Sequence, residues 1–398
     1  MSDRYSPKYF LSKDTNFMRK TRLKISTWSI LCATFALVSL LGIGLIVLNR
    51  TVAQAAGSLP YNATANGPYT VQGNKILGKD GRQYIIHGMA RDGLEYNCRG
   101  EGPLDKQTLA YMGPGNSTNG STYWGANTIR LPLSEVFWLS GQGSTCTAAQ
   151  YQALVKGTVD TITALHMNVM LDLHWVGAGR QSTNGGGQWP MPDGDSVTFW
   201  QQIATQYRGY SNVFFELYNE PVPPNWPCWQ KGCQVSGTGY SNDCHCSKQL
   251  SYQAVGMQTL VDTVRKSGAS NLVIVGGSNW GFDLSQLPNY PISGTNIVYD
   301  THPYAYANKS AKYWDWAFGN LSSRYPIISA ENGQYDCKED YMSQLLPYLD
   351  SHQMGWVAWA WVVNGNVCGY PQLVTDYRGT PANSMGVYIY KSLQRYRS

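Results

Sequence analysis

Charged side chains are scarce in this chain, at 14% of its 398 residues, and the net charge of +5 is concentrated at one end. Residues 1–24 carry seven Lys or Arg against two Asp, so the rest of the chain is close to neutral. A neutral body offers no basic surface to phosphate groups. The composition therefore argues against a nucleic-acid-binding protein, and we expect no nucleic-acid partner.

A second absence is local, because no charged side chain occurs between Ile25 and Leu48. This stretch is long enough, as a helix, to cross a bilayer, and its basic flank would leave residues 1–24 in the cytoplasm. It is either an uncleaved anchor, which its length favours, or an export signal, since Ala53-Gln54-Ala55 resembles a cleavage site. We expect a basic tail at 1–24, a transmembrane or signal segment at 25–48, a linker at 49–67 and an extracellular domain at 68–398, anchored to the membrane or secreted.

The cysteines are consistent with export, because eight of them lie beyond the apolar segment. They are Cys98, Cys146, Cys228, Cys233, Cys244, Cys246, Cys337 and Cys368. An even number in an exported chain predicts up to four disulfides, with pairing left open. The alternative for the local group around His245 is a zinc site, but the spacing lacks paired CxxC-like knuckles. We expect disulfides, and neither a metal nor a cofactor.

No glycine-rich phosphate-binding loop follows the first strand-like run, which disfavours an open doubly wound sheet. The chain has eight apolar runs that alternate with helical patterns, at residues 84–89, 127–131, 168–173, 213–219, 272–276, 297–302, 326–331 and 355–361. Helices are expected at 148–165, 197–207, 248–267, 311–322, 340–351 and 384–395. Eight β-then-α units predict an α/β fold, a closed (β/α)8 TIM barrel, preceded by a hairpin at 71–86 with its turn at 78–81.

Two of these runs end abruptly in a carboxylate, at Glu220 within Tyr218-Asn219-Glu220-Pro221 and at Glu331 within Ser329-Ala330-Glu331-Asn332. The carboxyl ends of the strands of a parallel barrel meet at one mouth, where active sites lie. A pair of carboxyl groups that face one bond is what glycoside hydrolysis needs. Other polar or aromatic residues lie at the ends of the second, third, fourth, sixth and eighth predicted strands, namely Arg130, His174, Asn219, His302 with Tyr304, and Trp359.

The chain resembles glycoside hydrolase family 5, the cellulase family of the (β/α)8 clan A, over about residues 69–395. The matching stretches are Ile129-Arg130-Leu131-Pro132, Leu171-Asp172-Leu173-His174, Leu217-Tyr218-Asn219-Glu220-Pro221, Asp300-Thr301-His302-Pro303-Tyr304 and Ser329-Ala330-Glu331. The resemblance implies that Glu220 is the acid/base and Glu331 the nucleophile of a retaining hydrolase. We expect Arg130 and Tyr304 to keep Glu331 ionised, and the pKa of Glu220 to be raised beside that charge.

The remaining candidates would bind substrate. We expect Asn219 to contact the sugar 2-hydroxyl, His174 and His302 to orient hydroxyls and the acid, and Trp359 to stack under the reacting sugar. Trp361 is the alternative platform, because it would point to the same side of a strand. Further tryptophans are candidates for flanking subsites or for packing, namely Trp175, Trp189, Trp226, Trp229, Trp280, Trp314 and Trp316.

The leading hypothesis is an exported, monomeric, endo-acting β-1,4-glycanase on glucan, whose partner is a β-linked polysaccharide and whose membrane contact runs through residues 25–48. A β-mannanase or another β-glucan hydrolase uses the same scaffold and stays open. A non-catalytic carbohydrate-binding wall protein is the rival from a different class, although such a protein has no reason to keep both glutamates.

Overall fold

The computed structural model describes residues 65–115, 122–365 and 368–396. The predicted tail at 1–24, the apolar segment at 25–48 and all but the last residues of the linker lie outside these ranges. Among the residues described, no helix is both long enough and apolar enough to span a membrane.

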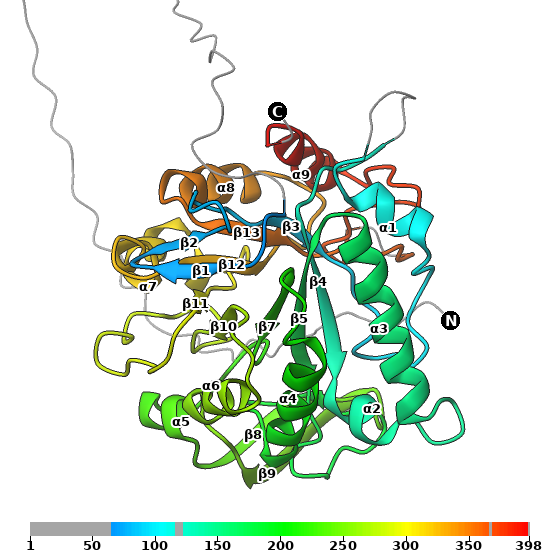
Figure 1. The fold of residues 1–398 in the computed structure, drawn as a ribbon, viewed down its shortest axis with the longest axis vertical. Coiled ribbons are helices and arrows are strands. Elements are labelled where there is room, and N and C mark those ends of the chain that lie inside the picture. Colours follow the sequence, from blue (N-terminus) through cyan, green and yellow to red (C-terminus); the bar gives the residue numbers. More distant parts are fainter. Residues whose placement is uncertain (1–64, 116–121, 366–367, 397–398) are drawn as a thin grey trace, which may run out of the picture. The chain divides into compact units, whose positions relative to one another are not determined.

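Eight parallel strands close into a barrel, which confirms the predicted fold (Figure 1). Each strand overlaps one of the predicted runs: β3 (His87–Ala90), β4 (Thr128–Ser134), β5 (Asn168–Trp175), β7 (Val213–Glu216), β10 (Val273–Gly276), β11 (Ile297–Asp300), β12 (Ile327–Asn332) and β13 (Gly355–Ala358). The barrel closes where β13 pairs with β3, with Trp356 opposite His87. The eight strand ends therefore meet at one mouth, as the sequence predicted.

The strands read as near-continuous apolar runs because both of their faces are buried. One buried cluster takes one or two residues from each of several strands, including Met170, Phe214, Ile274, Val298 and Ile328. Their neighbours in each strand belong to the larger cluster that packs under the helices. Side chains alternate along a strand, so the first cluster fills the barrel interior.

A hairpin closes the N-terminal end of the barrel. It consists of β1 (Thr70–Gln72) and β2 (Lys75–Leu77), and its turn is Gly73-Asn74, with φ +60° at Gly73. The predicted turn at 78–81 is a second reversal, across which Leu77 pairs with Gln83. Residues 71–86, which were expected to form a single hairpin, therefore contain two consecutive turns that each reverse the direction of the backbone. The hairpin contacts residues just before strands, as in the bond from the Val71 N–H to Asn296, and so leaves the opposite mouth for chemistry.

The helices are α1 (Lys106–Met112), α2 (Glu135–Ser140), α3 (Ala148–Ala164), α4 (Gly194–Tyr207), α5 (Trp226–Lys231), α6 (Met257–Lys266), α7 (Trp314–Ala317), α8 (Met342–Ser351) and α9 (Ser384–Gln394). Figure 1 shows α3 and α4 outside β4 and β5. Two of the predicted helices are only partly confirmed. The helix expected at 248–267 is a strand followed by α6, and the helix at 311–322 breaks into α7 between 3₁₀ turns, because the backbone leaves the helical region at Phe318.

A small antiparallel sheet is inserted beside the barrel. It contains β6 (Gly187–Gln188), β8 (Gln234–Ser241) and β9 (Cys246–Gln253). It joins the loop after β5 to the loop after β7, because Gln188 pairs with Tyr240. Residues 246–253, which cover the start of the helix expected at 248–267, pair with β8 along their whole length. This strand pairing overrides the local preference for a helix.

All four predicted disulfides are present. They are Cys98–Cys146, Cys228–Cys233, Cys244–Cys246 and Cys337–Cys368. Both local disulfides lie in the segment that follows Glu220. Cys228–Cys233 joins α5 to the residue before β8, and Cys244–Cys246 crosses the turn between β8 and β9. These pairs leave none of the four local cysteines as a thiolate, so the alternative of a zinc site at that loop was wrong.

Candidate active site

The two predicted glutamates lie together at the C-terminal mouth. Glu331 is on β12, whereas Glu220 follows the end of β7 by four residues, because β7 stops at Glu216. One oxygen of each glutamate and one nitrogen of His302 all lie within 4.8 Å of one another. Both carboxylates keep a small exposed surface, 8% of the Glu331 side chain and 12% of the Glu220 side chain. The pair is therefore close, largely desolvated and accessible from the mouth.

Both oxygens of Glu331 accept hydrogen bonds. Arg130, which is fully buried on β4, donates from Nη1 to Oε2 at 2.6 Å, and the hydroxyl of Tyr304 donates to Oε1 at 2.6 Å. Two strong donors and no acceptor are what an ionised carboxylate requires. The predicted contacts of Arg130 and Tyr304 with Glu331 are confirmed.

Arg130 holds more than Glu331. Its Nε and Nη2 donate to the two oxygens of Glu216 at 2.7 Å each, and Nη2 also lies 2.7 Å from Asn219 Oδ1 and 2.9 Å from Asp172 Oδ2. Burial by itself would raise the pKa of Glu216, but the charge and hydrogen bonds of Arg130 outweigh it and lower this pKa to about 2. The guanidinium therefore outweighs burial at Glu216, whereas at Asp172 burial outweighs the charge of Arg130 and raises the pKa well above its ordinary value.

The depressed pKa of Glu216 predicts a pH-dependent contribution to stability. Its ordinary value is 4.5, so this carboxylate stabilises the fold fully above pH 4.5, and the contribution is lost as pH falls toward 2. We expect Glu216→Gln to be destabilised at neutral pH by several kcal/mol, on the order of 3–5 kcal/mol for a broken buried pair. The gap to wild type should shrink below pH 4.5. Urea unfolding from pH 7 to pH 2.5 measures this gap, and a constant gap would contradict the assignment.

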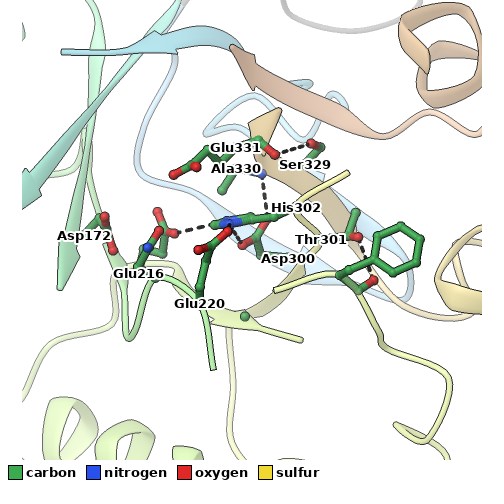
Figure 2. Close-up of polar contacts among 12 residues, drawn as sticks. Asp172, Glu216, Glu220, Asp300, Thr301, His302, Ser329, Ala330 and Glu331 are labelled. Carbon is green, nitrogen blue, oxygen red and sulfur yellow. Dashed lines mark hydrogen bonds and ion pairs between the residues drawn. The ribbon is translucent and has the colours of Figure 1, made fainter. Parts of the chain in front are cut away.

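His302 connects Glu220 to two other buried acids. Its Nδ1 lies 3.2 Å from Glu220 Oε1, and its Nε2 lies 2.7 Å from Asp300 Oδ2 and 3.8 Å from Glu216 (Figure 2). Burial would lower the pKa of His302, but the charge of Asp300 and the hydrogen bonds of the three carboxylates raise it well above its ordinary value. The ring therefore carries protons on both nitrogens and donates to Glu220.

The expectation of a raised pKa for Glu220 was wrong. Burial would raise this pKa, but the hydrogen bond and charge of His302 outweigh burial and lower it, with a smaller contribution from Lys309. The side-chain amide of Gln188 also donates to Glu220 Oε2. Donors on both oxygens favour the carboxylate. Glu220 is therefore marked as a proton-transfer group by its position, since geometry precedes pKa in such an assignment.

His174 is held as a neutral ring. Its Nδ1 lies 2.6 Å from Asp172 Oδ2, and its Nε2 lies 3.4 Å from Asn219 Nδ2. Burial, together with the nearby charge of Arg130, lowers the pKa of His174 to about 4. Nδ1 therefore donates to Asp172, and Nε2 is left as an acceptor. Because Asn219 accepts from Arg130 with its oxygen, its amide nitrogen faces His174.

The structure separates the two candidate platforms. The Trp359 ring lies almost parallel to His174, with centroids 5.4 Å apart, below the guanidinium of Arg130 at 5.7 Å, and keeps 6% of its surface exposed. Trp361 is fully buried and packs edge-on against Trp124, so it offers no face to a sugar and its prediction as a substrate-binding residue is corrected. The alternation argument failed because β13 already ends at Ala358.

The other tryptophans divide between packing and surface. Four are buried, namely Trp175, Trp189, Trp229 and Trp314. Trp226 and Trp280 are partly buried, and Trp316 is 57% exposed. The idea that Trp229 offers a ring to substrate is corrected, because its indole N–H is bonded to the Gly276 carbonyl inside the core.

Several residues of the site were not assigned a role from the sequence. Asp172, Glu216 and Asp300 are fully buried on β5, β7 and β11. The available signal was a charged residue within an apolar strand, which requires a buried partner. Gln188 gave no such signal, because only the inserted sheet places it beside Glu220.

Among the described residues, two groups of side chains are close enough together to bind a metal ion. They are Glu216 with Asp300 and His302, and Glu220 with His302 and Glu331. In both groups His302 already bonds carboxylates through each nitrogen, and Arg130 already supplies positive charge to Glu216 and Glu331. This pattern favours proton transfer over metal chemistry, and we propose no metal site here.

A parallel barrel that carries two close carboxylates at its C-terminal mouth is the class of site used by retaining glycoside hydrolases. The model of the family "Cellulase (glycosyl hydrolase family 5)" matches residues 116–365, which is more than half of the chain. The chain belongs to glycosyl hydrolase family 5.

Relatives with curated descriptions include an endoglucanase of Clostridium saccharobutylicum, 23% identical over 315 residues, 76% of this chain and 60% of that protein. Another is endoglucanase MaCel5A of Microbulbifer sp., 24% identical over 74% of this chain and 51% of that protein. The matched region thus spans only about half to three-fifths of these relatives. Among solved structures, a β-glucanase of Saccharophagus degradans in complex with cellotetraose matches with a TM-score of 0.64 and 21% identity, over 86% of this chain and 99% of that one. This likeness supports the fold.

Proposed function

We propose that this protein is a retaining, endo-acting β-glucanase that cleaves β-1,4-glucan through a covalent glycosyl-enzyme intermediate. The observation that carries the proposal is the short separation of Glu220 and Glu331, whose oxygens lie within 4.8 Å of each other. Retaining enzymes hold their two carboxyl groups about 5–5.5 Å apart, whereas inverting enzymes need about 6.5–9.5 Å to admit a water. The space between these two glutamates fits direct attack on the sugar.

In the first step, Glu331 is the nucleophile and Glu220 protonates the leaving oxygen. Because the lowered pKa leaves Glu220 ionised, the proton that it delivers comes from His302 Nδ1, which lies 3.2 Å from Glu220 Oε1. Glu331 suits attack because Arg130 and Tyr304 hold it as a carboxylate aimed at the mouth. The glycosyl bond then removes the negative charge of Glu331, which favours the ionised form of Glu220. Glu220 can therefore take the proton from the water that attacks in the second step.

The neighbours of the pair have supporting roles. Asn219 is fixed between Arg130 and His174, so that its amide can meet the 2-hydroxyl of the reacting sugar, a contact that strengthens as positive charge develops on the ring. His302 donates to Glu220 and fixes the direction of its carboxyl group. Trp359 supplies an apolar face on which the C–H groups of a sugar can pack.

The glucan assignment is supported by the relatives described as endoglucanases and by the cellotetraose bound in the Saccharophagus degradans structure. No described residue specifically favours mannan. A non-catalytic role is disfavoured because the carboxylate pair and its donors are intact. The four disulfides support action outside the cell. Our proposal also includes a monomer that is either secreted or anchored through residues 25–48.

Assay of the full chain on carboxymethyl-cellulose, mixed-linkage β-glucan and β-mannan tests the proposal. We expect reducing ends to appear on the two glucans, together with an early fall in viscosity, because endo cleavage shortens chains from within. The first product seen by proton NMR should be the β-anomer, as retention requires. A preference for mannan would replace the substrate assignment, and a first product of the α-anomer would contradict the mechanism.

A further inference from the structure

The indole nitrogen of Trp359 starts a chain of hydrogen bonds that leads away from the substrate. Its Nε1 donates to the hydroxyl of Tyr370 at 2.6 Å, and this hydroxyl donates to Asp92 Oδ2 at 3.2 Å. An indole N–H can only donate, so the Tyr370 oxygen must accept from it. The Tyr370 hydroxyl therefore donates its own proton to Asp92. The direction of both hydrogen bonds follows from the indole N–H, which can only donate.

This chain of hydrogen bonds joins the loops that follow the first and last strands of the barrel. Asp92 follows the end of β3 by two residues and is only 2% exposed, whereas Tyr370 belongs to the loop after β13. The Tyr370 loop is fixed to the platform by backbone bonds, because the Ala360 N–H donates to the Pro371 carbonyl and the Ala360 carbonyl accepts from the Leu373 N–H. Trp359, Tyr370 and Ala90 also pack in one small apolar cluster.

Further contacts hold both ends of this hydrogen-bonded chain, the Asp92 loop and the Tyr370 loop, in place. The guanidinium of Arg91, buried beside Asp92, donates to the backbone carbonyls of Asp92, Glu101 and Pro103, which fixes the loop that carries the acid. At the other end, the Cys337–Cys368 disulfide ties the loop that precedes Tyr370 to the loop after β12. Rigid supports of this kind hold a binding group within a narrow range of positions.

We propose that Tyr370 and Asp92 are positioning residues that fix the Trp359 ring as a substrate platform. This inference rests on the proposed function, in which Trp359 packs against the reacting sugar. Without the Tyr370 hydroxyl, the buried indole N–H would lack its partner, and the ring would rotate or admit water. The ring lies against His174 and Arg130, so its displacement would also disturb the groups that hold Asn219 and Glu331.

The proposal is tested with Tyr370→Phe and Asp92→Leu, which remove the hydroxyl and the acceptor. We expect kcat/KM on β-glucan to fall about tenfold in each variant. Asp92→Asn keeps an amide oxygen that can accept from Tyr370 and should stay within about twofold of wild type. Glu101→Gln is the matched control, because it removes a charge from the same loop while Arg91 still bonds the Glu101 backbone, and it should also stay within about twofold.

A double-mutant cycle separates positioning from general structural damage. In a Trp359→Phe background the indole donor is already absent, so adding Tyr370→Phe should change kcat/KM less than about twofold. An equal tenfold loss in both backgrounds would overturn the proposal, as would Tyr370→Phe and Asp92→Leu variants that match wild type.

A readout independent of activity separates this proposal from the proposed function. In protein labelled with 5-fluorotryptophan, the Trp359 fluorine resonance is identified by its absence in Trp359→Phe. We expect that resonance to shift in Tyr370→Phe and not in Glu101→Gln. If wild type hydrolyses no β-glucan while the resonance shifts, the proposed function fails and the hydrogen-bonded chain stands. An unshifted resonance in Tyr370→Phe overturns the chain whether or not the enzyme is active.

Discussion

Replacing Glu331 with alanine is expected to lower kcat on β-glucan by on the order of 10⁵-fold, because no covalent intermediate can form without the nucleophile. Arg130 and Tyr304 would remain and would surround an empty space at the sugar carbon. On an aryl cellobioside with a good leaving group, added azide can enter that space and attack directly. The expected product is a glycosyl azide of inverted configuration, identified by proton NMR.

Glu339→Gln provides the matched control for this variant. Glu339 is an exposed carboxylate eight residues further on, in the loop after β12, and its substitution should leave kcat unchanged. Retained product from Glu331→Ala in the presence of azide would remove Glu331 from the nucleophile role. So would activity within tenfold of wild type.

Replacing Glu220 with alanine is expected to give a loss that depends on the leaving group. The variant lacks the acid, so polysaccharide cleavage should fall by roughly 10²–10⁴-fold. An aryl cellobioside with an acidic phenol needs no protonation and should still glycosylate Glu331. Water attack would then be slow for want of a base, so stopped-flow measurement should show a burst of phenol followed by a slow steady state.

The comparison between substrates is the internal control for Glu220. A poor phenol should show no burst, because its departure requires the missing proton. An equal loss of rate on acidic and poor phenols would contradict the acid/base role. Azide should accelerate the second step and yield a product of retained configuration, because it attacks the glycosyl-enzyme and needs no base.

Much of the fold could be predicted because its signals are local. Each barrel strand is an apolar run of a few residues, and the period of strands and helices predicts the parallel barrel. The helix expected at 248–267 failed because residues 246–253 pair with β8, a partner that no pattern within the segment reveals. The prediction that Trp361 could be the sugar platform was wrong because it assumed that the strand continues to residue 361. β13 ends at Ala358, so the alternation of side chains along a strand does not extend to Trp361.

The identity of the main site residues was available from the sequence, because polar residues that end apolar strands in a barrel must gather at one mouth. Their charge states were not. The pKa of Glu220 is lowered by His302, whose own proton is held by Asp300, two residues earlier at the end of β11, and by Glu216 at the end of β7. Such coupling depends on the distances of 3.2 Å and 3.8 Å from His302 to Glu220 and Glu216, which lie far from it in the sequence.

The amino-acid sequence was sufficient for the barrel, the two glutamates and the number of disulfides, since each of these follows from short-range pattern or from residue count. The fold was needed to show which cysteines pair, that Gln188 reaches Glu220 and that Tyr370 joins Trp359 to Asp92. Gln188 reaches Glu220 because the inserted sheet joins the loops after β5 and β7. Tyr370 reaches Asp92 because β13 pairs with β3 where the barrel closes, and this pairing brings the loops that follow the last and first strands together. No single stretch of the chain contains this information.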